Sequence, residues 1–239
     1  MTVQFVNDGA QFFAASHDIL HASGIEIKIG SDFNEYAEIV KKGREIQGLG
    51  APFDPKLHDL GKDNAFWLTA HDDSGTLIHT QAAKLLSMGG KNLSNYMLTR
   101  FKEFPPALPD IDFVRSRYRA TPGSHAIKGD VVYHGDIWIN AEAGKAYRGV
   151  GLSSVFARYG LMMVMEQWNP DYIFGFMART VAFKGFAERM GYMHNEPGSL
   201  RWYREGNDTA MEGFLSYLSN EDVRFLFDMP LYELVQQAA

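Results

Sequence analysis

The sequence predicts one mixed α/β domain in which helices cover a central sheet. Apolar residues recur with a period of two in some segments and near 3.6 in others, as strands and amphipathic helices require. In the second half of the chain the two types alternate, at 131–140, 152–167, 171–176 and 180–192. This alternation is typical of a sheet with helices on its faces. With 239 residues, 46% of them hydrophobic, the chain can bury a full core.

The first half of the chain carries capping and turn residues between shorter segments. Asp32 stands where its side chain can cap the first turn of a helix, and Asp73-Ser74-Gly75 supplies the chemistry of a turn between two strands. The expected elements are a helix at 12–21, a strand at 25–29, a helix at 33–47, a loop or short turn at 53–62, and strands at 65–70 and 76–86.

Composition narrows the classes of function. A net charge of −6 argues against a nucleic-acid partner, because affinity for phosphate backbones comes from clustered Lys and Arg. The absence of cysteine excludes disulfides, thiolate metal sites and a cysteine nucleophile. No apolar run approaches about 18 residues and no signal peptide begins the chain, so we expect a cytoplasmic protein without a membrane span.

A glycine-rich stretch at 146–154 joins the expected strand at 131–140 to the following helix. Gly149 and Gly151 lack a Cβ, so backbone N–H groups there can approach a ligand. The first turn of a helix adds unpaired donors that suit an anion, and Arg148 adds a cation. The pattern therefore indicates a phosphate cradle, with an ordinary glycine-rich turn as the alternative.

Better-known glycine motifs do not fit this stretch. A Walker loop needs Gly-Lys followed by Ser or Thr, which is absent. A dinucleotide fingerprint and a nucleophile elbow both need glycine where Val155 stands.

Arg148-x-x-Gly151-x-Ser153 resembles the Arg/Gln-x-x-Gly-x-Gly/Ala signature of the GNAT acetyltransferases, whose loop and helix bind the pyrophosphate of acetyl-CoA. Ser153 departs from Gly or Ala but is small. A second match is Glu188-Arg189-Met190-Gly191-Tyr192, which is similar to the family's Glu-Lys-Leu-Gly-Phe. Two motifs in the right order are stronger evidence than either alone.

The resemblance implies a mixed, mostly antiparallel sheet flanked by helices, with a core at 24–205 and a helical extension at 209–239. It also implies an N-acetyltransferase that moves an acetyl or other acyl group from acetyl-CoA, or another acyl-CoA, to the amine of a small molecule or amino acid, without a metal. Residues 89–126, with a helix at 92–104 and a strand at 113–119, form an insertion that we expect to border the acceptor site.

Transfer to an amine needs a base, donors for the oxyanion and a proton for the departing thiolate. The family often carries a carboxylate base on the strand before the phosphate loop. Asp136 matches it, with His134 expected on the same face; a polar residue on a solvent-facing side is the alternative for each. The cofactor-binding residues implied are Trp138, Ile139, Asn140, Arg148, Gly149, Val150, Gly151, Leu152, Ser153 and Thr180.

The usual proton donor of the family is missing. Many members carry an Asn and a Tyr where this chain has Thr180 and Ala187. Tyr192, Tyr159 or a water are the substitutes, and we name Tyr192 as the candidate. A non-catalytic GNAT-like acyl-CoA-binding protein therefore stands as the alternative function. An acyl-homoserine-lactone synthase is disfavoured because that family's other motifs are absent.

Three features lie outside these motifs. His17 and His21 form either a metal-binding pair or two helix histidines without a third ligand. The arginines of 115–119 share one face of the expected strand, where they bind an acidic acceptor or cofactor phosphates, or form a basic edge. The apolar tail at 209–239 packs on the domain or on a second subunit, so a homodimer is a hypothesis.

The cradle generates a test with acetyl-CoA. At about 100 times its dissociation constant the ligand should raise the free energy of unfolding by about 2.7 kcal/mol, seen as a rise in Tm. Gly151→Val should remove most of this rise without unfolding the protein, because the added side chain obstructs the phosphate and not the core. Normal CoA binding by the variant would show that the cradle is wrongly assigned.

Overall fold

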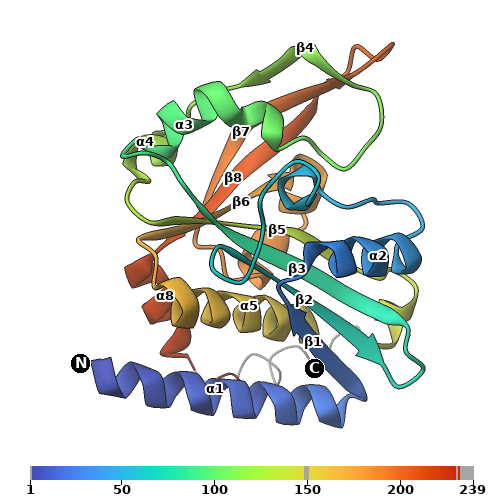
Figure 1. The fold of residues 1–239 in the computed structure, drawn as a ribbon, viewed down its shortest axis with the longest axis vertical. Coiled ribbons are helices and arrows are strands. Elements are labelled where there is room, and N and C mark those ends of the chain that lie inside the picture. Colours follow the sequence, from blue (N-terminus) through green and yellow to red (C-terminus); the bar gives the residue numbers. More distant parts are fainter. Residues whose placement is uncertain (1, 148–150, 230, 232–239) are drawn as a thin grey trace.

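The computed structural model describes residues 2–147, 151–229 and 231, and it contains an eight-stranded sheet in the order β1-β2-β3-β5-β6-β8-β7-β4 (Figure 1). The strands are β1 (Ile25–Gly30), β2 (Ala65–Asp72), β3 (Leu77–Leu86), β4 (Ile111–Tyr118), β5 (Val131–Ile139), β6 (Tyr172–Ala178), β7 (His194–Arg204) and β8 (Met211–Ser219). Of the pairings described, β5 with β6 is parallel and the others are antiparallel. The predicted mixed, mostly antiparallel sheet is confirmed.

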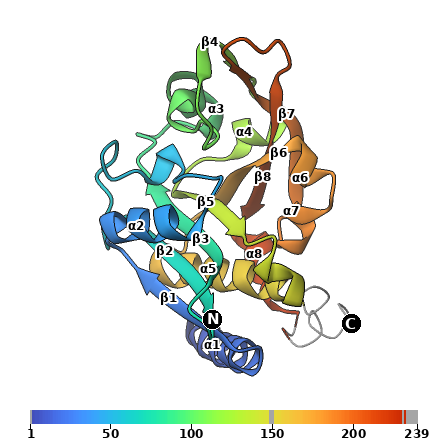
Figure 2. The ribbon, with the colours of Figure 1, turned by 90° about the vertical axis from the view of Figure 1, so that its right-hand side faces the viewer.

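Helices cover both faces of this sheet. They are α1 (Thr2–Ala22), α2 (Phe33–Gly43), α3 (Leu93–Arg100), α4 (Pro122–Ala126), α5 (Leu152–Trp168), α6 (Arg179–Ala182), α7 (Phe186–Arg189) and α8 (Asn220–Phe227), with 3-10 turns η1 (Ala51–Phe53), η2 (Phe101–Glu103) and η3 (Ala143–Tyr147). One core cluster joins α2 and α3 to the sheet, and another joins α5, α7 and α8 to the opposite face. In Figure 2, α2 and the α6–α7 pair lie on opposite sides of β5.

The ends of several helices follow from local chemistry. The Asp32 carboxylate accepts hydrogen bonds from the first backbone N–H groups of α2, as the sequence predicted. Ser219 and Asp222 form a capping box at the start of α8. By contrast, α5 begins after Gly151 at φ +76°, with no side chain capping its first turn. Its leading N–H groups therefore have no side-chain acceptor among the described residues.

The predicted helical tail at 209–239 is wrong in its first part. Met211–Ser219 is strand β8, which lies between β6 and β7 inside the sheet. Phe214, Leu215 and Leu218 are buried in this central strand, and burial on both faces removes the alternation that marks a strand. The core of the domain therefore extends beyond residue 205. Within the predicted tail, the described helix is α8, at Asn220–Phe227. Residues 230 and 232–239 lie outside the described residues.

Smaller corrections concern helix lengths. The helix expected at 33–47 ends at Gly43, and the one expected at 92–104 is α3 followed by the single turn η2. The helix expected at 180–192 is divided into α6 and α7 at Gly185, whose φ of +66° does not continue a helix. In the described ranges, no helix is both long and apolar enough to cross a membrane.

Candidate active site

A cleft opens where the parallel strands β5 and β6 diverge. Their pairing ends at Tyr133 with Phe174, although β5 continues to Ile139 and β6 to Ala178. Beyond that point β5 stays paired with β3 and β6 with β8, so the facing edges of the two strands part. A cavity of about 690 Å³ lies there and is lined by both strands. Past Tyr133 and Phe174, no pairing between β5 and β6 is described along these facing edges.

The lining of the cleft comes from both faces of the sheet. The α2-side half is lined by Ile46, Pro52, Phe53, residues 104–108, Leu200 and Trp202. The α7-side half is lined by Met177, Thr180, Val181, Phe186 and Tyr192. Residues 104–108 belong to the segment expected to border the acceptor site, and they do border the cleft.

Asp136 occupies a bulge of β5 at the edge of this cleft. The register with β3 shifts between Ala82 and Thr80, and Asp136 adopts φ +52°, which Asp tolerates better than most residues. The bulge turns its carboxylate toward α2, where the side chain is 1% exposed. His134 instead contacts the α5 and α7 side, so the prediction that the two share one face is wrong.

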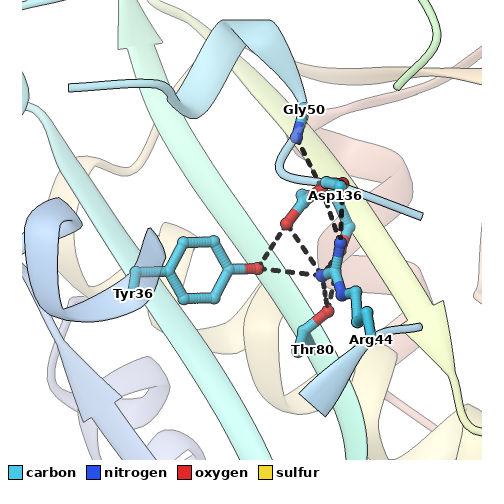
Figure 3. Close-up of polar contacts among 6 residues, drawn as sticks. Tyr36, Arg44, Gly50, Thr80 and Asp136 are labelled. Carbon is cyan, nitrogen blue, oxygen red and sulfur yellow. Dashed lines mark hydrogen bonds and ion pairs between the residues drawn. The ribbon is translucent and has the colours of Figure 1, made fainter. Parts of the chain in front are cut away.

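The Asp136 carboxylate accepts four hydrogen bonds from this chain (Figure 3). Arg44 donates to both oxygens, at 3.1 Å to Oδ1 and 2.8 Å to Oδ2. The backbone N–H of Gly50 donates to Oδ1 at 3.1 Å, and the Tyr36 hydroxyl donates to Oδ2 at 2.6 Å. Thr80 contacts Arg44 and also donates to the Asp136 carbonyl at 3.0 Å. The buried charge is thus paired and fully hydrogen-bonded.

These contacts determine the protonation states of Arg44 and Tyr36, the two side chains that donate to Asp136. Burial lowers the pKa of Arg44, but the neighbouring Asp136 and Tyr36 oppose it and the pKa lies above its ordinary value. Burial, together with the Asp136 charge, raises the pKa of Tyr36 well above its ordinary value. Arg44 is therefore a cation and Tyr36 a neutral donor.

A general base needs an accessible lone pair on the atom that takes the proton. Both Asp136 oxygens already accept two hydrogen bonds, so the geometry favours a positioning role over the predicted base role. The carboxylate joins the end of α2 and the loop at Gly50 to the bulge that borders the cleft.

His134 and Tyr192, two of the predicted catalytic residues, form a second buried network. Gln81 donates from Nε2 to the Phe156 carbonyl at 2.5 Å, which turns its Oε1 toward His134 Nε2 at 2.8 Å. His134 Nε2 must then be the donor, and Nδ1 accepts from the Tyr192 hydroxyl at 3.0 Å. Burial lowers the pKa of His134 to about 4 and raises that of Tyr192, so both are neutral at pH 7.

The predicted cofactor residues fall into three groups. Thr180 lines the cleft. Trp138 and Ile139 pair with β3, and Asn140 donates to the Ile78 carbonyl; among the described residues the cleft is lined by 133–137 of β5 rather than by these three. Arg148, Gly149 and Val150 lie outside the described residues, whereas Gly151, Leu152 and Ser153 form the start of α5.

The φ of Gly151 also bears on the Gly151→Val test. A branched residue at φ +76° is strained whether or not a phosphate binds. The informative quantity is therefore the rise in Tm that acetyl-CoA produces in each protein, not the Tm of the variant alone.

The remaining candidates lie away from the cleft. His17 Nε2 and the Tyr159 hydroxyl are hydrogen-bonded at 3.1 Å between α1 and α5. The part of the chain that the structure describes holds no group of three potential metal ligands. Arg115 pairs with the exposed Asp208 at 2.9 Å, and β4 is an edge strand, which supports the basic-edge alternative.

Comparisons with known proteins give fold likeness alone. No protein-family model and no curated protein matches the chain. An N-acetyltransferase from Staphylococcus aureus Mu50 matches with a TM-score of 0.45 and 12% identity, over 82% of this chain and 98% of that chain. A dodecameric spermidine N-acetyltransferase from Vibrio cholerae matches with a TM-score of 0.43 and 12% identity, over 83% and 95%. At these values the likeness carries no argument about activity.

The Arg44 contacts predict a large cost for removing the guanidinium. Arg44→Met leaves the Asp136 carboxylate buried beside an apolar side chain, so the free energy of unfolding should fall by about 3–5 kcal/mol in urea titrations. Arg44→Met combined with Asp136→Asn should lose less, because no charge is then stranded. Arg100→Met removes the exposed Arg100–Glu103 pair and should cost under about 1 kcal/mol. If Arg44→Met and Arg100→Met lowered the free energy of unfolding equally, the positioning role of Asp136 would be contradicted.

Buried His134 predicts a loss of stability in acid. The unfolded chain protonates this ring near pH 6.5, whereas the folded protein does so near pH 4. The unfolded state therefore binds more protons between these values, and His134 should lower the free energy of unfolding by about 2 kcal/mol between pH 7 and 5. His134→Gln should remove that share of the pH dependence, and His21→Gln, at an exposed position, is the matched control. An unchanged pH dependence in His134→Gln would contradict the assignment.

Proposed function

We propose that the chain is an acyl-CoA-dependent N-acyltransferase of the GNAT type, which transfers an acyl group from a CoA thioester directly to an amine. The observation that carries this proposal is the cleft between the diverging ends of β5 and β6. Its two facing strand edges offer backbone groups to an extended, amide-containing ligand. The pantetheine arm of CoA has that chemistry.

The start of α5 is suited to bind the anionic end of the same ligand. The helix follows β5 in the chain, and Gly151 begins it without a side-chain cap. Its N–H groups and partial positive charge suit a pyrophosphate. The strand edges and the helix start would thus bind two different parts of one cofactor.

Direct transfer requires few groups from the protein. The amine nitrogen attacks the thioester carbonyl, the C–S bond breaks, and the thiolate takes up the proton that the nitrogen loses. Backbone N–H groups of the parted β5 edge would stabilise the developing oxyanion. The Tyr192 hydroxyl lines the cleft but already donates its one proton to His134, so the thiolate would take its proton from the amine and not from Tyr192.

A second candidate function is binding of an acyl-CoA without turnover. The observation that favours it is the saturation of the polar groups: Asp136 accepts from three residues, and Tyr192 donates to His134. No described side chain of these networks is then free to take the proton of the amine.

Release of free CoA thiol separates the two functions. Acetyl-CoA and a panel of primary amines at pH 8 should give thiol release that depends on both enzyme and amine. A ligand-induced rise in Tm without thiol release from any amine would favour the binding protein. Neither a rise in Tm nor thiol release would overturn both.

A further inference from the structure

The walls of the cleft carry almost no uncompensated charge. Among the described residues that line it, Asp136, Arg179 and Glu212 are formally charged. Asp136 is neutralised by Arg44, and Arg179 is paired with Glu212 at 3.0 Å. Neither a polycation nor a polyanion finds an unpaired counter-charge there.

The α2-side half is the more apolar part. Apart from Gln47 and the neutralised Asp136, its lining consists mainly of aliphatic, proline and aromatic side chains, which come from Ile46, from η1, from residues 104–108 and from β7. Phe104 is the centre of an aromatic cluster, with Tyr133 at 4.9 Å and Phe176 at 6.0 Å between ring centroids. Flat, apolar ligand groups gain from burial against such rings.

A positive charge lies behind this wall. The ammonium of Lys84 lies 5.7 Å from the centroid of the Phe104 ring. Burial lowers the pKa of Lys84 to about 8, so it is still mostly protonated at pH 7, and Glu103 opposes that shift. A second cation in the ligand would meet repulsion from Lys84 here and a desolvation cost, since the neighbouring Glu103 carboxylate is already paired with Arg100.

We propose that the acceptor is a primary monoamine whose body is aromatic or otherwise apolar, and that this body occupies the α2-side half of the cleft. This inference rests on the proposed N-acyltransferase function. The neutral nitrogen forms the new N–C bond at the thioester carbonyl near β5, the C–S bond breaks, and the proton leaves for the thiolate. The apolar body meanwhile displaces water from the exposed apolar side chains of this half, which include Ile46 and Leu108.

The amine panel tests this directly. We expect kcat/KM for phenethylamine to exceed that for putrescine by at least about 100-fold, since apolar contacts of this size are gained by one amine alone. Glutamate, which brings two carboxylates, should react as poorly as putrescine. Thiol release without amine is subtracted from each rate.

A matched pair of variants locates the effect. Leu108 lines the α2-side half and is 41% exposed, so Leu108→Glu adds a carboxylate there without disturbing the core. It should lower kcat/KM for phenethylamine about 10-fold or more and narrow the ratio to putrescine. Leu98, 60% exposed on α3 and absent from the described lining, gives the control Leu98→Glu, which should keep the wild-type ratio.

The outcomes are distinguishable. Faster reaction with putrescine or glutamate than with phenethylamine would overturn this inference and leave the proposed function intact. The same would follow if Leu108→Glu kept the wild-type ratio. No thiol release with any amine would overturn the proposed function, and the acceptor class with it.

Discussion

The buried pair of Arg44 and Asp136 determines how the cleft is built. Asp136 is held in a left-handed bulge of β5, and its carboxylate is bound by the end of α2 and by the loop at Gly50. A buried pair is weak evidence for stability in itself, because desolvation offsets much of the attraction. Its value here is geometric, since it fixes the bulge beside the point where β5 leaves β6.

The second network works on the opposite side of the same strand. Gln81, His134 and Tyr192 form a chain of neutral hydrogen bonds that begins at the Phe156 carbonyl of α5. Gly175 is needed where β6 passes this chain, because a Cβ there would lie 2.6 Å from the His134 carbonyl oxygen. One network is ionic and the other neutral, but in each the polar side-chain atoms form their hydrogen bonds within the protein. The cleft between them is therefore lined mostly by apolar side chains, with the Arg179–Glu212 pair and the polar Gln47, Thr180 and Ser216 as further lining groups.

The parts of the fold that sequence could predict are those with a clear period or cap. The strand ending at Ile139, the helix beginning after Gly151 and the cap at Asp32 are local features, and the structure has them. The sequence did not predict β8, because a strand that is buried on both faces shows no alternation of polar and apolar residues. Arg44 was missed for another reason. It follows Lys41, Lys42 and Gly43 at a helix end, where a cation is common, and its partner lies 92 residues away on a bulge that no local sequence pattern predicts.

A cleft of this kind also changes what catalysis requires. An alkylamine with a pKa near that of lysine is neutral in only about one molecule in a thousand at pH 7, so its proton must be lost before attack. An apolar wall disfavours the ammonium form and lowers the pKa of a bound amine by desolvation. In the proposed reaction the ammonium proton would then leave through water before the nitrogen reaches β5, and no carboxylate base would be needed at the carbonyl. If the acceptor is the apolar amine proposed above, the wall that binds its body would also favour its nucleophilic form, and the four hydrogen bonds that Asp136 accepts would then serve to position the bulge.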